Sequence, residues 1–207
     1  MRMTLSKPNG SPGERGAPVR QRVLEAAERL LRSGKAGFSM RDLAAEAGVS
    51  FATPFNQFGS KAGVMHALSG RRIETMAMRY TAATPPADRA GRIRLAVAVA
   101  VAVMLEEPDV NRAVMGSLGT AGPARTDALE RSAAFWALAW TGEAMVGVSR
   151  RPSASDGPYQ LALAFRGALS FWSAGELSDD ELRQAALAIA DTLAPVPPHL
   201  PCRTSPG

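Results

Sequence analysis

A short stretch in the first third of the chain carries side chains suited to contacting a nucleic acid. Residues 50–57 read Ser-Phe-Ala-Thr-Pro-Phe-Asn-Gln, and Lys61 follows. Amide side chains such as Asn56 and Gln57 pair with the edge of adenine, and a phenyl ring such as that of Phe51 meets the thymine methyl group. A lysine ammonium neutralises phosphate. These residue types therefore favour hydrogen bonding and charge pairing with duplex DNA.

Such side chains can read DNA only if a short helix presents them and a second helix holds it across a tight turn. Ser39, with Asp42 three residues later, predicts the capped start of the supporting helix. Gly48 permits the left-handed backbone of a turn, and Ser50 is expected to cap the short helix that follows. The sequence thus predicts a helix-turn-helix over residues 39–58. The buried stripe of its first helix is predicted to be Met40, Leu43, Ala44 and Ala47.

The charge of the chain is distributed unevenly. Its net charge is +5, yet the first 80 residues hold 13 Lys and Arg against 6 Asp and Glu, while the remaining 127 hold 11 against 13. The front of the chain is therefore at +7 and the rest at −2. A basic end on a nearly neutral body is typical of a protein that approaches a polyanion such as DNA.

Composition excludes several other classes of protein. Hydrophobic residues at 46% and charged residues at 21% are ordinary globular values, and the single cysteine, Cys202, offers no disulfide framework. The longest apolar run, Leu95 to Leu105, is shorter than the roughly 18 residues of a membrane span. The first residues lack the apolar core of a secretory signal. We expect a cytoplasmic protein that makes no contact with a membrane.

The sequence contains few residues or motifs that would support catalysis. His66 and His199 are too isolated to build a metal or catalytic site, and we expect His66 to be a solvated or capped helix residue. After Tyr80 there is no HExxH, no phosphate-binding loop and no GxSxG. We expect no metal and no cofactor. An all-helical enzyme, with the front helices as a folding cap, stays as an alternative.

Helical periodicity predicts an all-α protein with two domains. A flexible arm is expected over residues 1–18 and a flexible tail over residues 196–207. A three-helix domain containing the helix-turn-helix is expected over residues 19–82, and a larger helical domain over residues 88–195. Leu95 to Met104 also satisfies the alternation of a strand, but we predict a buried helix because both faces are apolar and no strand partner follows.

Between about Val19 and Leu68 the sequence resembles the TetR family of helix-turn-helix repressors. The first helix shares Arg20-x-x-Val23-Leu24-x-Ala26-Ala27 with that family. The second helix and its turn share Phe38-Ser39-Met40-Arg41-Asp42-Leu43-Ala44-x-x-Ala47-Gly48-Val49-Ser50. Phe55-x-x-Phe58-x-Ser60-Lys61 completes the match. The rest of the chain resembles the family only in outline.

The resemblance implies a homodimeric transcriptional repressor that binds a near-palindromic operator and responds to a ligand. Lys61 matches the phosphate-binding lysine of the family, and Ser39 and Arg41 lie where the second helix meets the DNA backbone. Phe55 replaces the usual tyrosine, whose hydroxyl contacts phosphate, and Pro54 replaces an aliphatic residue. The positions that face the groove or its walls are Ser50, Phe51, Ala52, Thr53, Phe55, Asn56 and Gln57.

The larger domain supports weaker predictions. A small, largely apolar effector is expected in a cavity, although the same residues could form a solid core. The candidates are Met104, Met115, Trp136, Trp140, Met145 and Phe165. The resemblance places the last two helices in a dimer interface, although their stripes could also pack within the chain. The interface candidates are Leu161, Phe165, Leu169, Trp172, Leu182, Ala186, Ile189 and Leu193. A ligand-independent architectural DNA binder remains an alternative.

Overall fold

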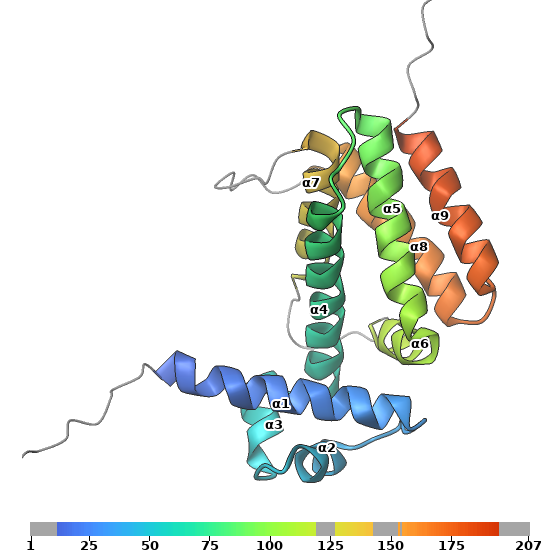
Figure 1. The fold of residues 1–207 in the computed structure, drawn as a ribbon. Helices are drawn as coiled ribbons and strands as arrows, with labels where there is room; N and C mark the ends of the chain where they lie inside the picture. Colours follow the sequence, from blue (N-terminus) through green and yellow to red (C-terminus); the bar gives the residue numbers. More distant parts are fainter. Residues whose placement is uncertain (1–11, 119–126, 143–152, 154, 195–207) are drawn as a thin grey trace, which may run out of the picture.

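The computed structural model describes residues 12–118, 127–142, 153 and 155–194, and these residues form α-helices and no strands (Figure 1). The predicted all-α fold is confirmed. The helices are α1 (Pro12–Arg32), α2 (Met40–Ala47), α3 (Ala52–Phe58), α4 (Lys61–Ala82), α5 (Arg89–Glu106), α6 (Pro108–Ser117), α7 (Ala128–Thr141), α8 (Gly157–Ser173) and α9 (Asp179–Leu193).

The N-terminal unit consists of α1, α2, α3 and the first half of α4. In Figure 1, α1 lies across the foot of α4, with α2 and α3 on its far side. Apolar side chains at helical spacing along α1, among them Val23, Ala27 and Leu30, meet Leu43 of α2 and Leu68 of α4 in one buried cluster. This cluster fixes the angle at which the short α3 is presented.

Helix α4 connects the two parts of the molecule. Its 22 residues make it about 33 Å long. Val64 and Leu68 are buried in the N-terminal cluster, whereas Met76 and Tyr80 are buried in the larger one. One continuous helix therefore contributes to both cores and joins the N-terminal unit to the larger domain.

The larger domain packs α5, α7, α8 and α9 beside the second half of α4 (Figure 1). The alternating segment Leu95 to Met104 lies within α5, so the predicted helix is confirmed. Ile93, Val97, Trp136, Leu161 and Trp172 are fully or almost fully buried there. Ala98 and Ala102 of this segment are exposed, and because these exposed positions are alanines the segment shows little helical amphipathicity.

Helix α6 is an element that the sequence analysis does not predict. Proline is well tolerated in the first turn of a helix, where its missing N–H would have no partner, and α6 begins at Pro108. Val110 and Val114 of α6 pack into the N-terminal cluster. The larger domain therefore touches the DNA-binding unit through α6 as well as through α4.

Helix α1 is longer than expected. It begins at Pro12 instead of Val19 and contains Pro18, so residues 12–18 of the expected arm are helical. The rest of the expected arm and the expected tail lie outside the described residues. A proline at the first position of a helix costs no hydrogen bond. No helix in the described ranges has the length and apolar character to span a bilayer.

Candidate DNA-binding interface

The supporting helix α2 is fixed at both ends by local chemistry. Ser39 Oγ accepts a hydrogen bond from the Asp42 backbone N–H at 3.2 Å, and Asp42 Oδ2 accepts one from the Ser39 N–H at 2.8 Å. This confirms the predicted capping box, whose hydrogen bonds lower the pKa of Asp42. At the other end Gly48 has φ 60° and closes the helix in the left-handed conformation. The predicted stripe Met40, Leu43, Ala44 and Ala47 is buried.

The start of α3 differs from its expected form. The position before the first helical residue belongs to Phe51, which makes no side-chain cap, while the Ser50 hydroxyl bonds that of Thr53 at 2.8 Å. Ser50 therefore does not cap α3 with its side chain as expected; the Thr53 N–H donates instead to the Ser50 carbonyl oxygen at 2.9 Å. Pro54 is buried and faces the protein.

The outer face of α3 is apolar and exposed. Phe51 and Phe55 are 54% and 40% exposed, and their rings meet edge to face with centroids 5.3 Å apart. The Arg41 guanidinium lies 5.7 Å from the centroid of Phe51. Ala52 and Asn56 are also exposed on α3. Two large apolar rings in solvent, with a cation beside them, make a surface suited to a partner that has both apolar and anionic groups.

Arg20 of α1 closes the other end of α3. Its Nη1 donates to the Gln57 carbonyl oxygen at 2.9 Å, and its guanidinium lies 4.3 Å from the ring centroid of Phe58. The last carbonyl groups of a short helix have no partner within the helix, so this contact stabilises the end of α3. Arg20, recognised in the sequence only by its match to a family, thus positions the helix.

Lys61 is at the first position of α4, next to α3. Its Nζ donates to the Ala36 carbonyl oxygen at 2.6 Å and lies 4.4 Å from the ring centroid of Phe38, and partial burial lowers its pKa. An ammonium has three donors, so two stay available after this contact. Lys61 lies beside α3, and its contact with DNA phosphate stays a prediction.

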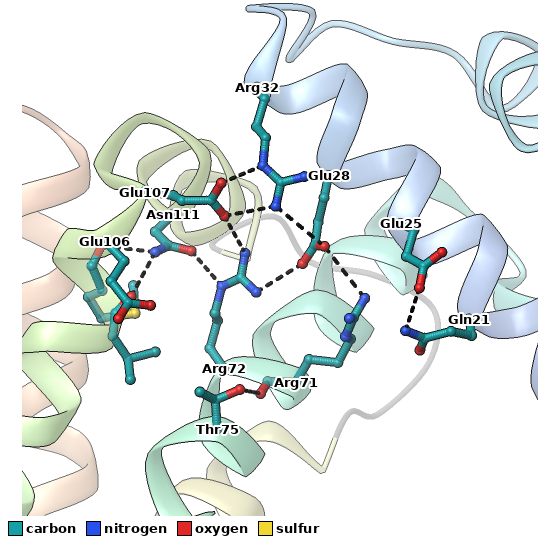
Figure 2. A network of polar contacts seen from close by, with 12 residues as sticks. Gln21, Glu25, Glu28, Arg32, Arg71, Arg72, Thr75, Glu106, Glu107 and Asn111 are labelled. Atoms are coloured by element: carbon teal, nitrogen blue, oxygen red, sulfur yellow. Dashed lines mark hydrogen bonds and ion pairs between the residues drawn. The ribbon is translucent and has the colours of Figure 1, made fainter. Parts of the chain in front are cut away.

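Behind this surface, a polar network joins the DNA-binding unit to the larger domain (Figure 2). Glu28 of α1 is 5% exposed, and its carboxylate is 2.9 Å from Arg72 Nη1 and 3.6 Å from Arg71 Nη1 on α4. Arg32 of α1 donates both to Glu107 Oε1 and, at 3.1 Å, to Glu107 Oε2. Ion pairs thus link α1 to α4 and to the junction of α5 and α6.

Asn111 is the fully buried centre of this junction. Its side-chain amide nitrogen donates to the carbonyl oxygens of Val103 and Met104 at 3.2 Å and 2.8 Å, and its oxygen accepts from Arg72 Nε at 2.9 Å. A buried amide is tolerated only when its donors and acceptor are satisfied, as they are here. Asn111 therefore fixes α6 to the end of α5 and to α4.

The larger domain contains a cavity of about 330 Å³ between α4, α5, α6, α7 and α8. Met104, Met115, Trp136 and Phe165, all predicted as candidates, are among its lining residues. Arg72 and Asn111 of the network also line it. The cavity and the polar network therefore share two side chains.

Two of the residues predicted to line the cavity, Trp140 and Met145, are not confirmed as lining residues. Trp140 is not among the lining residues; its ring packs against Gly157, where an added Cβ would come within 2.2 Å of it, and the Arg89 guanidinium lies 4.9 Å from its centroid. The first turn of α8 thus fills the space beside this end of α7, so the expected role of Trp140 is wrong. Met145 lies outside the described residues.

Two lining residues were missed by the sequence analysis. His66, expected to be a solvated or capped helix residue, is partly buried and lines the cavity, where burial and then the charge of Arg166 lower its pKa. Arg166 lines the cavity and is the only charged residue of α8. A lone charge in a 17-residue apolar helix was a signal that could have been used.

Most of the predicted interface residues are already covered within the protomer. Leu161, Phe165, Leu169, Trp172, Leu182 and Ala186 are between 0% and 5% exposed and belong to the core of the larger domain, while Ile189 and Leu193 are partly buried against it. The assignment of these six buried residues to a dimer surface is therefore corrected. The exposed large apolar residues of α8 and α9 are Leu163, Phe171 and Leu187.

The capped α2, the left-handed turn and the exposed short α3 define a helix-turn-helix of the kind that binds DNA. Residues 23–68 match the family model of bacterial regulatory proteins of the tetR family. Comparison with curated proteins gives no match.

Solved structures share the fold over most of this chain. A TetR transcriptional regulator from Rhodococcus sp. RHA1 is 22% identical with a TM-score of 0.69, covering 86% of this chain and 97% of its own. A protein of unknown function from the same organism is 23% identical with a TM-score of 0.52, covering 89% and 94%. The multidrug binding protein EbrR, solved with imidazole, is 21% identical with a TM-score of 0.53, covering 86% and 96%.

The resemblance to the TetR family is thereby confirmed, both by the N-terminal match and by the fold. The N-terminal unit therefore matches the DNA-binding part of tetR-family regulators, and the described residues share the fold of a TetR regulator.

Proposed function

We propose that the protein is a homodimeric repressor that binds a near-palindromic operator through α3 and releases it when a ligand enters the cavity. The observation that carries the proposal is the exposed face of α3. A seven-residue helix that leaves Phe51 and Phe55 in solvent, while its Pro54 side packs on the protein, presents apolar surface without a partner.

We assign the groove contacts to the outer face of α3. Phe51 and Phe55 suit thymine methyl groups, and Asn56 suits an adenine edge. Ser50, Ala52, Thr53 and Gln57 lie on or beside this face and complete the contact set. Arg41, Ser39 and Lys61 surround it and suit phosphate, with Lys61 keeping or exchanging its bond to the Ala36 carbonyl.

We assign the dimer interface to the outer faces of α8 and α9. Leu163 and Phe171 are 45% and 54% exposed on α8, and Leu187 is 45% exposed on α9. Leu163, Gly167, Phe171 and Ala174 follow the helical spacing of one face. A two-fold axis through this surface pairs two copies of the same patch and matches the symmetry of a palindromic operator.

The shared side chains of the cavity and the network support the ligand response. Arg72 and Asn111 line the cavity and also bind Glu28 of α1 and the last carbonyls of α5. A ligand that favours another arrangement of α4 and α6 would change the position of α1 and the spacing of two α3 helices. The EbrR structure, solved with imidazole, supports small-molecule binding by this fold.

A band-shift assay with the DNA upstream of the protein's own gene tests the proposal. A scrambled duplex of equal length is the control, and moderate salt weakens contacts made to phosphate alone. We expect binding that prefers the natural duplex and that a panel of small amphipathic compounds can reverse. Equal binding to both duplexes would contradict an operator, and selective binding that no compound reverses would favour the ligand-independent alternative.

A further inference from the structure

We infer that the cavity binds an amphipathic organic anion, a carboxylate on an apolar body of about ring size, with Arg166 as its counter-ion. This inference rests on the proposed ligand response and defines its chemistry. The expected effector was largely apolar. We infer an acidic group in addition, because the lining contains polar groups as well as an apolar wall.

Arg166 has no acidic partner among the described residues. Its Nη1 donates to the Met115 sulfur at 3.3 Å and its Nη2 to the Met115 carbonyl oxygen at 3.4 Å, both weak contacts. Burial alone lowers the pKa of Arg166. Arg72, the other arginine of the lining, is by contrast paired with Glu28 and Glu107. A half-buried guanidinium without a carboxylate is costly unless an anion completes the site.

The charged residues that line the cavity within the described part of the chain have one sign. They are two arginines and a histidine, with no Asp or Glu among them. A cationic ligand would meet Arg166 without any counter-charge in this wall, and a neutral ligand would leave the guanidinium unpaired. An anion gains charge-assisted hydrogen bonds, which are the strongest of the available contacts.

Two further polar groups of the lining lack partners among the described residues. These are Nδ1 of His66 and Nε1 of Trp136, both buried. The indole N–H can only donate, and a neutral imidazole can donate or accept. Together with Arg166 they leave the lining with buried polar groups that a polar ligand can satisfy.

The remaining wall determines the body of the ligand. The Trp136 ring packs edge to face against two phenyl rings. Its centroid lies 4.9 Å from that of Phe135 and 5.3 Å from that of Phe165. Met104 and Met115 add adaptable apolar surface. At about 330 Å³ the cavity is at the small end of ligand sites, so it suits a ring-sized body.

The test compares three probes of the same shape and different charge by calorimetry on the full chain. They are naphthoate, naphthylmethanol and naphthylmethylamine, substituted at the same ring position, with acetate and inorganic phosphate as anions that lack the body. We expect naphthoate to bind at least about tenfold more tightly than each of the other four.

Variants then assign the effect to Arg166. Arg166→Gln should weaken naphthoate binding by about tenfold to a hundredfold and leave naphthylmethanol within about twofold, while Arg166→Lys should retain part of the affinity. Arg94→Gln is the matched control, because Arg94 is exposed and paired with Asp191 away from the cavity. Thermal unfolding and circular dichroism check that each variant is folded.

Several results would overturn the inference. They are equal or tighter binding of the alcohol or the amine by the natural protein, equal binding of acetate or phosphate, a uniform loss for all probes in Arg166→Gln, and no binding of any probe. The comparison of probes on the natural protein holds even if Arg166→Gln fails to fold. The band shift without ligand tests DNA binding separately, so selective DNA binding together with any of these results overturns this inference alone.

Discussion

Arg72 Nη1 donates a 2.9 Å hydrogen bond to Glu28 Oε1 and thereby ties a wall of the cavity to the first helix of the DNA-binding unit (Figure 2). The same guanidinium bonds Asn111 on α6. Three helices thus meet at one side chain. This arrangement links the cavity to α1 physically, because a change in the angle between α1 and α4 would break or remake these contacts.

Removal of the Glu28 charge should destabilise the fold. Glu28→Gln leaves Arg71 and Arg72 without their buried carboxylate, and we expect the free energy of unfolding to fall by about 2 kcal/mol, since Arg72 keeps Glu107 and Asn111. Urea denaturation measures the change. The control is Glu46→Gln, which breaks an exposed pair with Arg29 and should cost less than about 1 kcal/mol. Equal losses in the two variants would contradict a buried network.

The contact between Glu107 and Arg32 should make the stability of the fold depend on pH in the acidic range. The hydrogen bond from Arg32 is the main reason why the pKa of Glu107 lies below its ordinary 4.5. Because the pKa is lower in the folded state, the contact stabilises the protein above about pH 4.5 and is lost as the pH falls through the folded-state value. Between about pH 5 and about pH 3 the natural protein should therefore lose more stability than Glu107→Gln. Parallel curves in denaturation at several pH values would count against this contact.

Lys61→Ala should weaken binding to all DNA sequences. If the ammonium contacts phosphate, the variant loses affinity for operator and random DNA by a similar factor, and the salt slope decreases by about one per protomer. Titration at several salt concentrations measures both. The control Arg79→Ala removes an exposed arginine of α4 that is paired with Glu106. An unchanged affinity at low salt would remove Lys61 from the interface.

Charged residues on the outer faces of α8 and α9 should separate the proposed dimer. Phe171→Glu with Leu187→Glu places carboxylates where apolar surface would be buried between copies. Sedimentation should show a dimer for the natural protein and a monomer for the double variant. Met78→Glu, at another exposed apolar residue of α4, should stay dimeric. A natural protein that sediments as a monomer would contradict the proposed interface.

The helix-turn-helix was predictable because its signals are local. Ser39 and Asp42 cap one another across three residues, and Gly48 has to be left-handed for the chain to turn. The buried stripe of α2 follows from spacing alone. A family match then added Arg20 and Lys61, whose contacts with Gln57 and Ala36 span 37 and 25 residues.

The larger domain was less predictable because its features depend on tertiary neighbours. Trp136 and Trp140 share one face of α7, yet only Trp136 meets the cavity, since Gly157 of α8 packs on Trp140. Spacing identified the apolar stripe of α8 but not whether it faces the protomer's core or a partner. Whether Arg166 has an acid opposite it cannot be read from periodicity.

The ratio of specific to non-specific affinity tests the central claim most directly, because that claim is that the outer face of α3 reads DNA sequence. Fluorescence anisotropy at about 0.15 M salt would compare operator and scrambled duplex for the natural protein, for Phe51→Ala with Phe55→Ala, and for the control Met78→Ala. We predict a ratio of at least about 10³ that falls at least tenfold in the double variant and stays unchanged in the control, with little loss of stability, since all three side chains are exposed. A ratio near one for the natural protein, or an unchanged ratio in the double variant, would contradict the account.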